Sequence, residues 1–141
     1  MTLSLVKLQK NHIQSIDTDF DFWKSSRDVM CEQPLNGYTA LLNETPIALG
    51  GVYKMWDGVA EGWFIVGKHG KNFPIKLART VRFMAKKMIN DNKLVRLQAS
   101  VCLNDKKALR FIKWLNFKEE GIMRKFGPDG VDYMRYAWVK A

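Results

Sequence analysis

A group of acidic side chains lies near the amino-terminus of this otherwise basic sequence. Asp17, Asp19, Asp21 and Asp28 have a spacing similar to that of a calcium-binding loop, in which carboxylates at alternate positions hold the ion. Such a loop also needs a glycine at its sharp turn and a closing glutamate, and neither stands at the matching position here. We therefore predict no metal site in this segment.

The cysteines and histidines form no pattern that favours metal or redox chemistry. Cys31 and Cys102 are far apart in the sequence, which predicts neither a disulfide framework nor a set of zinc ligands. His12 and His69 are isolated from each other and from the cysteines. Two unpaired thiols fit a reducing, cytoplasmic setting.

The composition limits the classes of partner. A formal net charge of +9 would attract nucleic acid, an anionic membrane face or a phosphorylated small molecule. No nucleic-acid-binding motif accompanies the charge, so nucleic-acid binding is not predicted, and a lysine-rich surface without a specific partner stays an alternative. No apolar run approaches the roughly 20 residues that span a bilayer, and we expect no membrane contact.

The segment from Leu94 to Phe117 combines a strand with a short amphipathic helix. Apolar and polar residues alternate up to Cys102, which is typical of a strand. Asn104 or Asp105 then suits the start of a helix. The apolar face of that helix consists of residues at three- and four-residue steps: Ala108, Phe111, Ile112 and Leu115.

The sequence as a whole predicts one α+β domain over residues 1–141, because hydrophobic residues make up 47% of it and apolar segments alternate with turn signals. Asn72 is the expected cap of the long helix, and Gly50–Gly51 indicates a bulge or a close backbone approach. The other expected elements are strands at 3–7, 38–42, 47–55, 59–66, 121–126 and 131–139, helical segments within 9–33 and at about 73–90, and turns at 43–46, 57–58 and 127–130.

The segment Asn104, Ala108, Ile112 and Leu115–Phe117 resembles the last conserved part of the GNAT superfamily, the Gcn5-related N-acetyltransferases. Ile112 stands where this family usually has tyrosine, and Asn116 where it usually has glycine. The order of the predicted elements is also similar from end to end. The resemblance implies a GNAT-like fold, with a mixed, mostly antiparallel sheet of six to seven strands flanked by about four helices.

The resemblance implies acetyl-coenzyme A as co-substrate. In this family the thioester enters between two splayed strands, and the pantetheine arm would hydrogen-bond the backbone of Trp63–Val66. The pyrophosphate would sit at the start of the long helix, which is the place of Lys68–Phe73 in this sequence. The residues that we assign to the co-substrate are Phe64, Ile65, Val66, Lys68, Gly70, Lys71, Asn72, Phe73, Asn104, Lys107, Ala108 and Phe111.

The phosphate loop departs from the family pattern. Gly70 is the one loop glycine in register, Phe73 stands where a small residue is usual, and Pro74 has no N–H to donate. Lys68, Lys71 and Lys76 would partly compensate by direct contact with phosphates. The alternative is a loop that only caps the helix and carries solvated lysines.

Two residues are candidates for the proton transfers of an acetyltransferase. Glu61 is the candidate general base, acting directly or through water, and the alternative is a solvent-facing strand residue. The family's usual thiolate acid is the tyrosine replaced by Ile112, so Tyr133 is our candidate in its place. Other hydroxyl or thiol groups that would serve instead are those of Tyr136, Ser100 and Cys102.

Two functions follow from the resemblance. One is an N-acetyltransferase that acts on a primary amine of a small molecule or protein, in a bacterial or phage-infected cell and as a candidate homodimer. The other is a protein that keeps the fold without catalysis and acts in binding or assembly, similar in layout to small virion-associated proteins of tailed bacteriophages. Free N–H groups converging at Gly70–Phe73 would favour the enzyme, whereas filling of the site by Phe73 or Ile112 would favour the other function.

Overall fold

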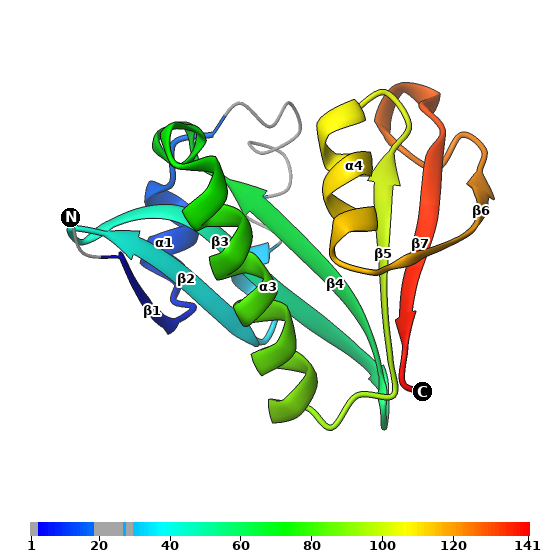
Figure 1. The fold of residues 1–141 in the computed structure, drawn as a ribbon, viewed down its shortest axis with the longest axis horizontal. Helices are drawn as coiled ribbons and strands as arrows, with labels where there is room; N and C mark the ends of the chain where they lie inside the picture. The colour runs from blue at the N-terminus through cyan, green and yellow to red at the C-terminus, as the bar shows by residue number, and fades with distance from the viewer. Residues whose placement is uncertain (1–2, 19–26, 28–29) are drawn as a thin grey trace. The chain divides into compact units, whose positions relative to one another are not determined.

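The computed structural model describes residues 3–18, 27 and 30–141. Its elements follow the predicted order (Figure 1) and are β1 (Leu3–Lys7), α1 (Lys10–Ser15), β2 (Gly37–Leu42), β3 (Thr45–Trp56), β4 (Val59–Val66), the 3₁₀ helix η1 (Lys68–Asn72), α3 (Pro74–Asp91), β5 (Arg96–Cys102), α4 (Lys106–Trp114), β6 (Lys118–Met123), the 3₁₀ helix η2 (Pro128–Gly130) and β7 (Tyr133–Val139). Residues 30–32 are also helical. Asp19, Asp21 and Asp28 of the acidic group considered in the sequence lie outside the described residues.

The strands form one seven-stranded sheet in the order β1-β2-β3-β4-β5-β7-β6. The pairs β1–β2, β2–β3, β5–β7 and β6–β7 are antiparallel, whereas β4–β5 is parallel over Val59↔Arg96 to Glu61↔Gln98. The predicted mixed, mostly antiparallel α+β fold is therefore confirmed. The strands β4 and β5 are parallel because the chain runs back through α3 between them. Both strands therefore begin at the same end of the sheet.

The chain divides into two compact units, and the strands β3 and β4 contribute to both. One unit consists of residues 1–53 and 63–91, and the other of residues 54–62 and 92–141. The single domain expected from the sequence stays a prediction.

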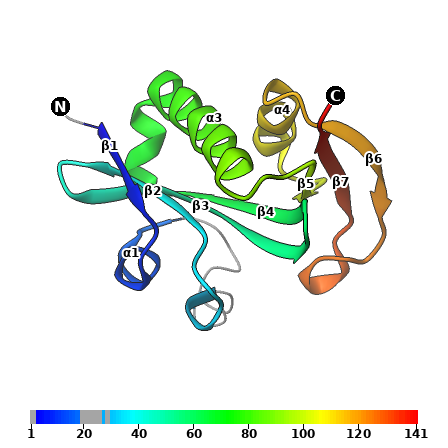
Figure 2. The same ribbon diagram turned by 90° about the horizontal axis from the view of Figure 1, so that it is seen from below.

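In the first unit, α1 and α3 cover opposite faces of the strands (Figure 2). On one side, Ile13 and Ile16 of the α1 region pack with Leu49 of β3 and Ile65 of β4 in a buried cluster. On the other side, the buried residues of α3 are Leu77, Val81, Met84 and Met88. The three- and four-residue steps between them place these residues on one face of the helix, within the segment predicted at about 73–90.

The glycine pair in β3 serves close packing. A Cβ atom at Gly50 would lie 2.4 Å from Sδ of Met84, and one at Gly51 would lie 2.6 Å from the ring of Trp63. Of the two predicted alternatives, the close approach is therefore present at this pair. Between β2 and β3 the register shifts at Ala40/Leu41 instead.

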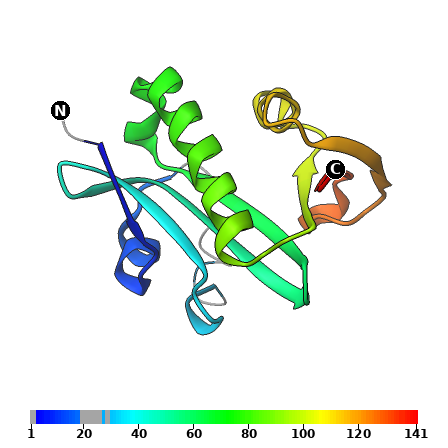
Figure 3. The ribbon, with the colours of Figure 1, turned by 60° about the horizontal axis from the view of Figure 1, so that its bottom comes forward.

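In the second unit, α4 lies beside β5, and β6 is the edge strand next to β7 (Figure 3). The strand predicted at 121–126 begins and ends three residues earlier in the structure. It is β6, which pairs with β7 from Lys118 and ends at Met123. Lys125 has a φ of 57°, a left-handed conformation that ends the extended chain. The predicted strand boundary failed because the glycine at 121 lies within a bulge, not at a strand start.

Within the described ranges, no helix is long and apolar enough to cross a membrane. Those ranges also contain no group of three or more histidine, cysteine, aspartate or glutamate side chains that could hold a metal ion.

Candidate active site

The loop between β4 and α3, which the sequence assigned to phosphate binding, forms the 3₁₀ helix η1. Its turns use backbone donors internally, since the N–H of Gly70 donates to the carbonyl of Gly67 at 3.0 Å and that of Phe73 to the carbonyl of Gly70 at 3.1 Å. At its start, the N–H of Gly67 donates to the carbonyl of Ile47 and that of Lys68 to the carbonyl of Asp17. Four backbone donors around this loop are therefore engaged within the fold.

Gly70 has a structural reason to be glycine. It is buried, and a Cβ atom there would lie 2.8 Å from the carbonyl oxygen of Ile47 and 3.2 Å from the side chain of Val66. The close contact is with the backbone of β3, which cannot move aside easily. The one loop glycine in register is thus explained by packing against the neighbouring strand.

At the start of α3, Phe73 and not Asn72 precedes the first helical residue. The carbonyl of Phe73 accepts from Leu77 at 2.8 Å, and Pro74 occupies the first helical position. The expected cap by Asn72 is therefore wrong, because η1 carries Asn72 into its own turn. Among the residues that the structure describes, none accepts from the backbone N–H groups of Ile75 and Lys76, the two donors left at this helix end.

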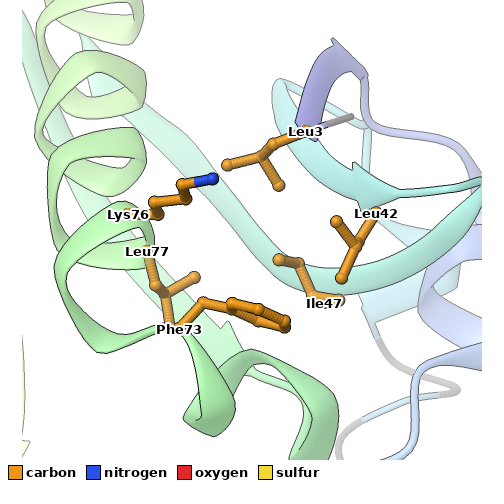
Figure 4. A pocket seen from close by; sticks show the side chains of 6 residues that line it. All are labelled: Leu3, Leu42, Ile47, Phe73, Lys76 and Leu77. Carbon is orange, nitrogen blue, oxygen red and sulfur yellow. The ribbon is translucent and has the colours of Figure 1, made fainter. Parts of the chain in front are cut away.

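The Phe73 side chain lies in an apolar hollow of the first unit (Figure 4). Leu42 and Ile47 from the strands face it across the hollow, and Leu77 of α3 completes the wall. The free space is about 10 Å³, no more than a single water molecule occupies. Phe73 therefore acts as a packing residue that anchors the loop to the sheet.

The predicted pantetheine strand, residues 63–66, is fixed by contacts within the first unit. Ile65 is buried in the core cluster, and Trp63 stacks on Tyr53 with ring centroids 6.4 Å apart. The carbonyl of Val66 accepts from the Thr18 hydroxyl at 2.6 Å. This stretch of backbone is held in an extended, defined conformation.

The second unit brings Glu61 into a cluster of charges that spans β4, β5, β7 and β6. Oε1 of Glu61 accepts from Nη1 of Arg135 at 2.6 Å and from Nε2 of Gln98 at 3.1 Å. The side chains of Glu61 and Arg135 are 30% and 20% exposed. Within the described ranges no group donates to Oε2 of Glu61, so this oxygen is open to a ligand.

The orientation of the Gln98 amide is set by its other neighbour. Nε of Arg96 donates to Oε1 of Gln98 at 2.9 Å, and a guanidinium can only donate. The amide nitrogen of Gln98 is thereby directed to Glu61. Arg96 is itself held by a two-pronged contact with Glu120, at 2.9 and 2.5 Å, and these hydrogen bonds raise the pKa of Arg96 and lower that of Glu120.

Tyr133, the predicted thiolate acid, stands at the far end of the same sheet region. Tyr133 lies opposite Cys102 of β5, and Glu61 lies opposite Gln98 of the same strand. Cys102 and Gln98 are four residues apart, which is about 13 Å at the rise of a strand. Burial raises the pKa of Tyr133, so its phenol keeps its proton at neutral pH. The structure does not bring the two predicted catalytic residues together.

The start of α4 shows which of the two candidate residues caps the helix. Asp105 does so, because its carboxylate accepts from the N–H of Ala108 at 3.1 Å. That donor is consequently occupied within the helix. Asn104 and Lys107 are exposed, and Phe111 packs on Trp114 with ring centroids 5.7 Å apart.

Asn116 ends α4 in the manner of the glycine that it replaces. Its φ is 70°, its N–H donates to the carbonyl of Lys113, and the N–H of Phe117 donates to that of Ile112. These two bonds define a Schellman motif, in which asparagine is the best-tolerated substitute for glycine. The departure at Asn116 therefore preserves the local structure.

Sequence reasoning missed the partners of Glu61. Arg135 is 74 positions away, and only the strand register brings it to Glu61. Arg96 and Gln98 are polar residues of the predicted strand before Cys102, and the alternation there assigns them no role. The signal available in the sequence was the placement of charged residues at alternate positions in strands that are otherwise apolar.

The whole described architecture is similar to solved acetyltransferase structures. An acetyltransferase of the GNAT family from Bacillus anthracis matches with a TM-score of 0.75 and 14% sequence identity, over 99% of this chain and 95% of that one. Ard1 from Thermoplasma volcanium matches with a TM-score of 0.76 and 12% identity, over 100% and 99% of the two chains. A point mutant of the spermidine N-acetyltransferase from Vibrio cholerae matches with 0.72 and 13%, over 98% and 94%.

No protein-family model matches the sequence, and no curated protein sequence matches it either. The likeness in structure nevertheless extends over the whole chain in each comparison. The chain therefore has the fold of the GNAT acetyltransferases.

Proposed function

We propose that the protein is an N-acetyltransferase that moves an acetyl group from acetyl-coenzyme A to a primary amine. The observation that carries this proposal is Glu61, a half-buried carboxylate on a strand of a GNAT fold, with one oxygen fixed by two donors and the other open. An incoming ammonium group gives a proton to Glu61, directly or through water. The amine nitrogen then bonds to the thioester carbon and gives up its second proton, the carbon–sulfur bond breaks, and the departing thiolate takes up a proton to leave as the thiol.

For acetyl-coenzyme A, we propose contacts from the strand, the loop and the last helix. The extended backbone at Phe64, Ile65 and Val66 suits pairing with the amide groups of the pantetheine arm. The phosphates would be held less by the backbone of the loop than by Lys68 and Lys71, because Gly70 and Phe73 already use their N–H groups. Gly70, Asn72 and Phe73 support the loop in this proposal.

On the second unit, we propose that Lys107 contributes a positive charge to the phosphates and that Asn104 offers its exposed amide. Ala108 and Phe111 form the helix face that these two residues flank. Tyr133, which is protonated at neutral pH, is the proposed donor to the thiolate.

A second candidate function is binding or assembly without catalysis. The observation that favours it is the loop, where the backbone donors of Gly70 and Phe73 are satisfied internally and Pro74 has none. Ile112, in the place of the usual tyrosine, is consistent with it. Such a protein would bind neither co-substrate nor amine at these residues.

We further propose a cytoplasmic location, since Cys31 and Cys102 are free thiols. If the protein forms a homodimer, we propose that the two copies do not pair their β6 strands and that the interface uses another surface. The exposed residues Lys118, Glu119 and Glu120, together with the bulge before Gly121, protect that edge from pairing with another strand.

The test is an assay of thiol release from acetyl-coenzyme A with a panel of primary amines. We expect turnover that depends on the amine and is lost in Glu61→Gln, with acetylated amine detected by mass spectrometry. Glu32→Gln, an exposed carboxylate elsewhere in the chain, is the matched control and should retain full activity. Absence of amine-dependent release across the panel would overturn the proposal in favour of the second candidate.

A further inference from the structure

Gln98 lies at the centre of the charge cluster, and both polar atoms of its side chain have partners. Its Oε1 accepts from Nε of Arg96 at 2.9 Å. Its Nε2 donates to Oε1 of Glu61 at 3.1 Å and to the sulfur atom of Met55 at 3.6 Å. Side chains from β5, β4 and β3 thus surround a single amide group.

These partners permit only one orientation of the Gln98 amide. A guanidinium donates and cannot accept, whereas an ionised carboxylate accepts and cannot donate. Turning the amide over would place its nitrogen against Nε of Arg96 and its oxygen against Glu61. Both hydrogen bonds would then be replaced by repulsion, so Gln98 always presents a donor to Glu61.

Arg96 is held in place independently of Gln98. Its Nη1 and Nη2 donate to the two carboxylate oxygens of Glu120 at 2.9 and 2.5 Å, a bidentate pair that fixes the plane of the guanidinium. The direction of the Nε–H bond follows from that plane, because the guanidinium is rigid and flat. The edge strand β6, through Glu120 and Arg96, therefore sets the direction in which Gln98 donates.

Both donors to Glu61 meet the same oxygen. Oε1 accepts from Nε2 of Gln98 and from Nη1 of Arg135, and a carboxylate oxygen has two lone pairs. While both bonds are made, Oε1 has no lone pair left for a proton. Oε2, to which no described residue donates, is the oxygen that remains for the proton of an amine.

We propose that Gln98 and Arg96 are positioning residues of the acetyl transfer, which hold the Glu61 carboxylate so that Oε2 takes the proton of the incoming amine. This inference rests on the proposed acetyl transfer and assigns the proton to one atom of its base. The proton leaves the amine nitrogen, bonds to Oε2 and returns to solvent before the next turnover. Neither residue touches the substrate, since Gln98 acts on Glu61 and Arg96 acts only through Gln98.

The test is a double-mutant cycle on the turnover number for thiol release. In Gln98→Met the donor is lost, and the turnover number should fall about tenfold to a hundredfold, as loss of a hydrogen bond to a charged group does. Arg96→Lys keeps a cation for Glu120 and loses the Nε donor. The amide then samples both orientations, and the turnover number should fall about twofold to tenfold. Arg124→Lys, the same change at an exposed arginine outside the cluster, should leave it unchanged.

The double variant decides whether Arg96 acts through Gln98. Its turnover number should equal that of Gln98→Met within about twofold, because no amide is left for Arg96 to orient. Losses that multiply would overturn the role of Arg96, and an unchanged turnover number in Gln98→Met would overturn that of Gln98.

A merely structural contact is distinguished by urea denaturation of the same variants. Such a contact changes the free energy of unfolding and leaves the turnover number of the fully folded protein unaltered. Assays are therefore run where every variant is folded. Loss of turnover that disappears under these conditions would overturn the inference and leave the acetyl transfer standing, whereas absence of turnover in the wild-type protein would overturn both.

Discussion

The loop at η1 and the charge cluster around Glu61 differ in how their polar groups are used. At η1, the N–H groups of Gly67, Lys68, Gly70 and Phe73 all donate to carbonyls of the fold. In the cluster, half-buried charges are held firmly and still keep an open oxygen on Glu61. The four N–H groups at η1 thus serve folding, and open backbone donors remain beyond them, at Ile75 and Lys76, whereas the cluster keeps capacity for a ligand on a side chain.

The difference shows that a motif of neighbouring residues does not by itself identify a binding site, and that a site can be built from several strands without any motif. A glycine followed by a helix suggests a phosphate cradle, yet Gly70 is needed because the backbone of β3 passes beside it. The charges of the cluster come from four strands and form no motif in the sequence. Glu61→Gln and Gly70→Ala test this contrast directly, and two smaller effects, at His12 and Asn116, test the elements around these regions.

The largest effect is expected from Glu61→Gln. The amide keeps the size of the side chain and cannot accept a proton, so the turnover number should fall by about 10²- to 10⁴-fold, as loss of a general base does. Steady-state kinetics of thiol release measure it. Affinity for acetyl-coenzyme A, measured by calorimetric titration, should stay unchanged, and an unchanged turnover number would remove Glu61 from the mechanism.

Gly70→Ala tests the structural role of the loop. The added methyl group meets the carbonyl of Ile47 at 2.8 Å, and we expect the free energy of unfolding to fall by about 1–3 kcal/mol, as overpacking does. Urea denaturation measures it. Gly130→Ala is the comparison, since its φ of 75° carries strain but its Cβ meets nothing within 4 Å. An undisturbed stability in Gly70→Ala would restore the glycine as a ligand-approach residue.

The burial of His12 in the first unit predicts that the free energy of unfolding depends on pH. Its Nδ1 accepts from the N–H of Gln9 at 3.1 Å and contacts the Thr39 hydroxyl at 2.8 Å, and burial lowers the pKa of His12. The unfolded chain therefore binds the proton more readily than the folded one. Stability should be complete above about pH 6.5 and fall as the pH drops below it, by at most about 1.4 kcal/mol per pH unit.

Denaturant unfolding at pH 7.5 and pH 5.5 measures this slope, and His12→Gln should reduce it. Stability that rises on acidification over this range would contradict the buried neutral form of His12.

The smallest effect is expected at the end of α4. Asn116→Gly should change the free energy of unfolding by only a few tenths of a kcal/mol, because both residues accept the left-handed conformation that Asn116 adopts. Asn116→Ala should cost about 1 kcal/mol. Equal stabilities of the two variants, compared by thermal unfolding, would show that the Schellman turn does not depend on this residue.

Local patterns predicted the elements well and the site only in part. The strand at 59–66 and the buried stripe of α3 follow from apolar periodicity, which is a property of neighbouring residues. The contact between Glu61 and Arg135 depends on the register of three strands, which no local pattern determines. The φ of 70° at Asn116 shows that asparagine suits a turn at which the GNAT pattern usually has glycine, and the sequence alone does not reveal this.

The most direct test of this account is calorimetric titration of the purified protein with acetyl-coenzyme A and with coenzyme A at two salt concentrations. We predict micromolar binding of both, reduced but retained at high salt, because the strand backbone contributes beside the lysine charges. The same affinity should be found in Glu61→Gln. No binding, or weak binding that disappears as salt is raised, would contradict the account and identify the fold as a scaffold without its co-substrate.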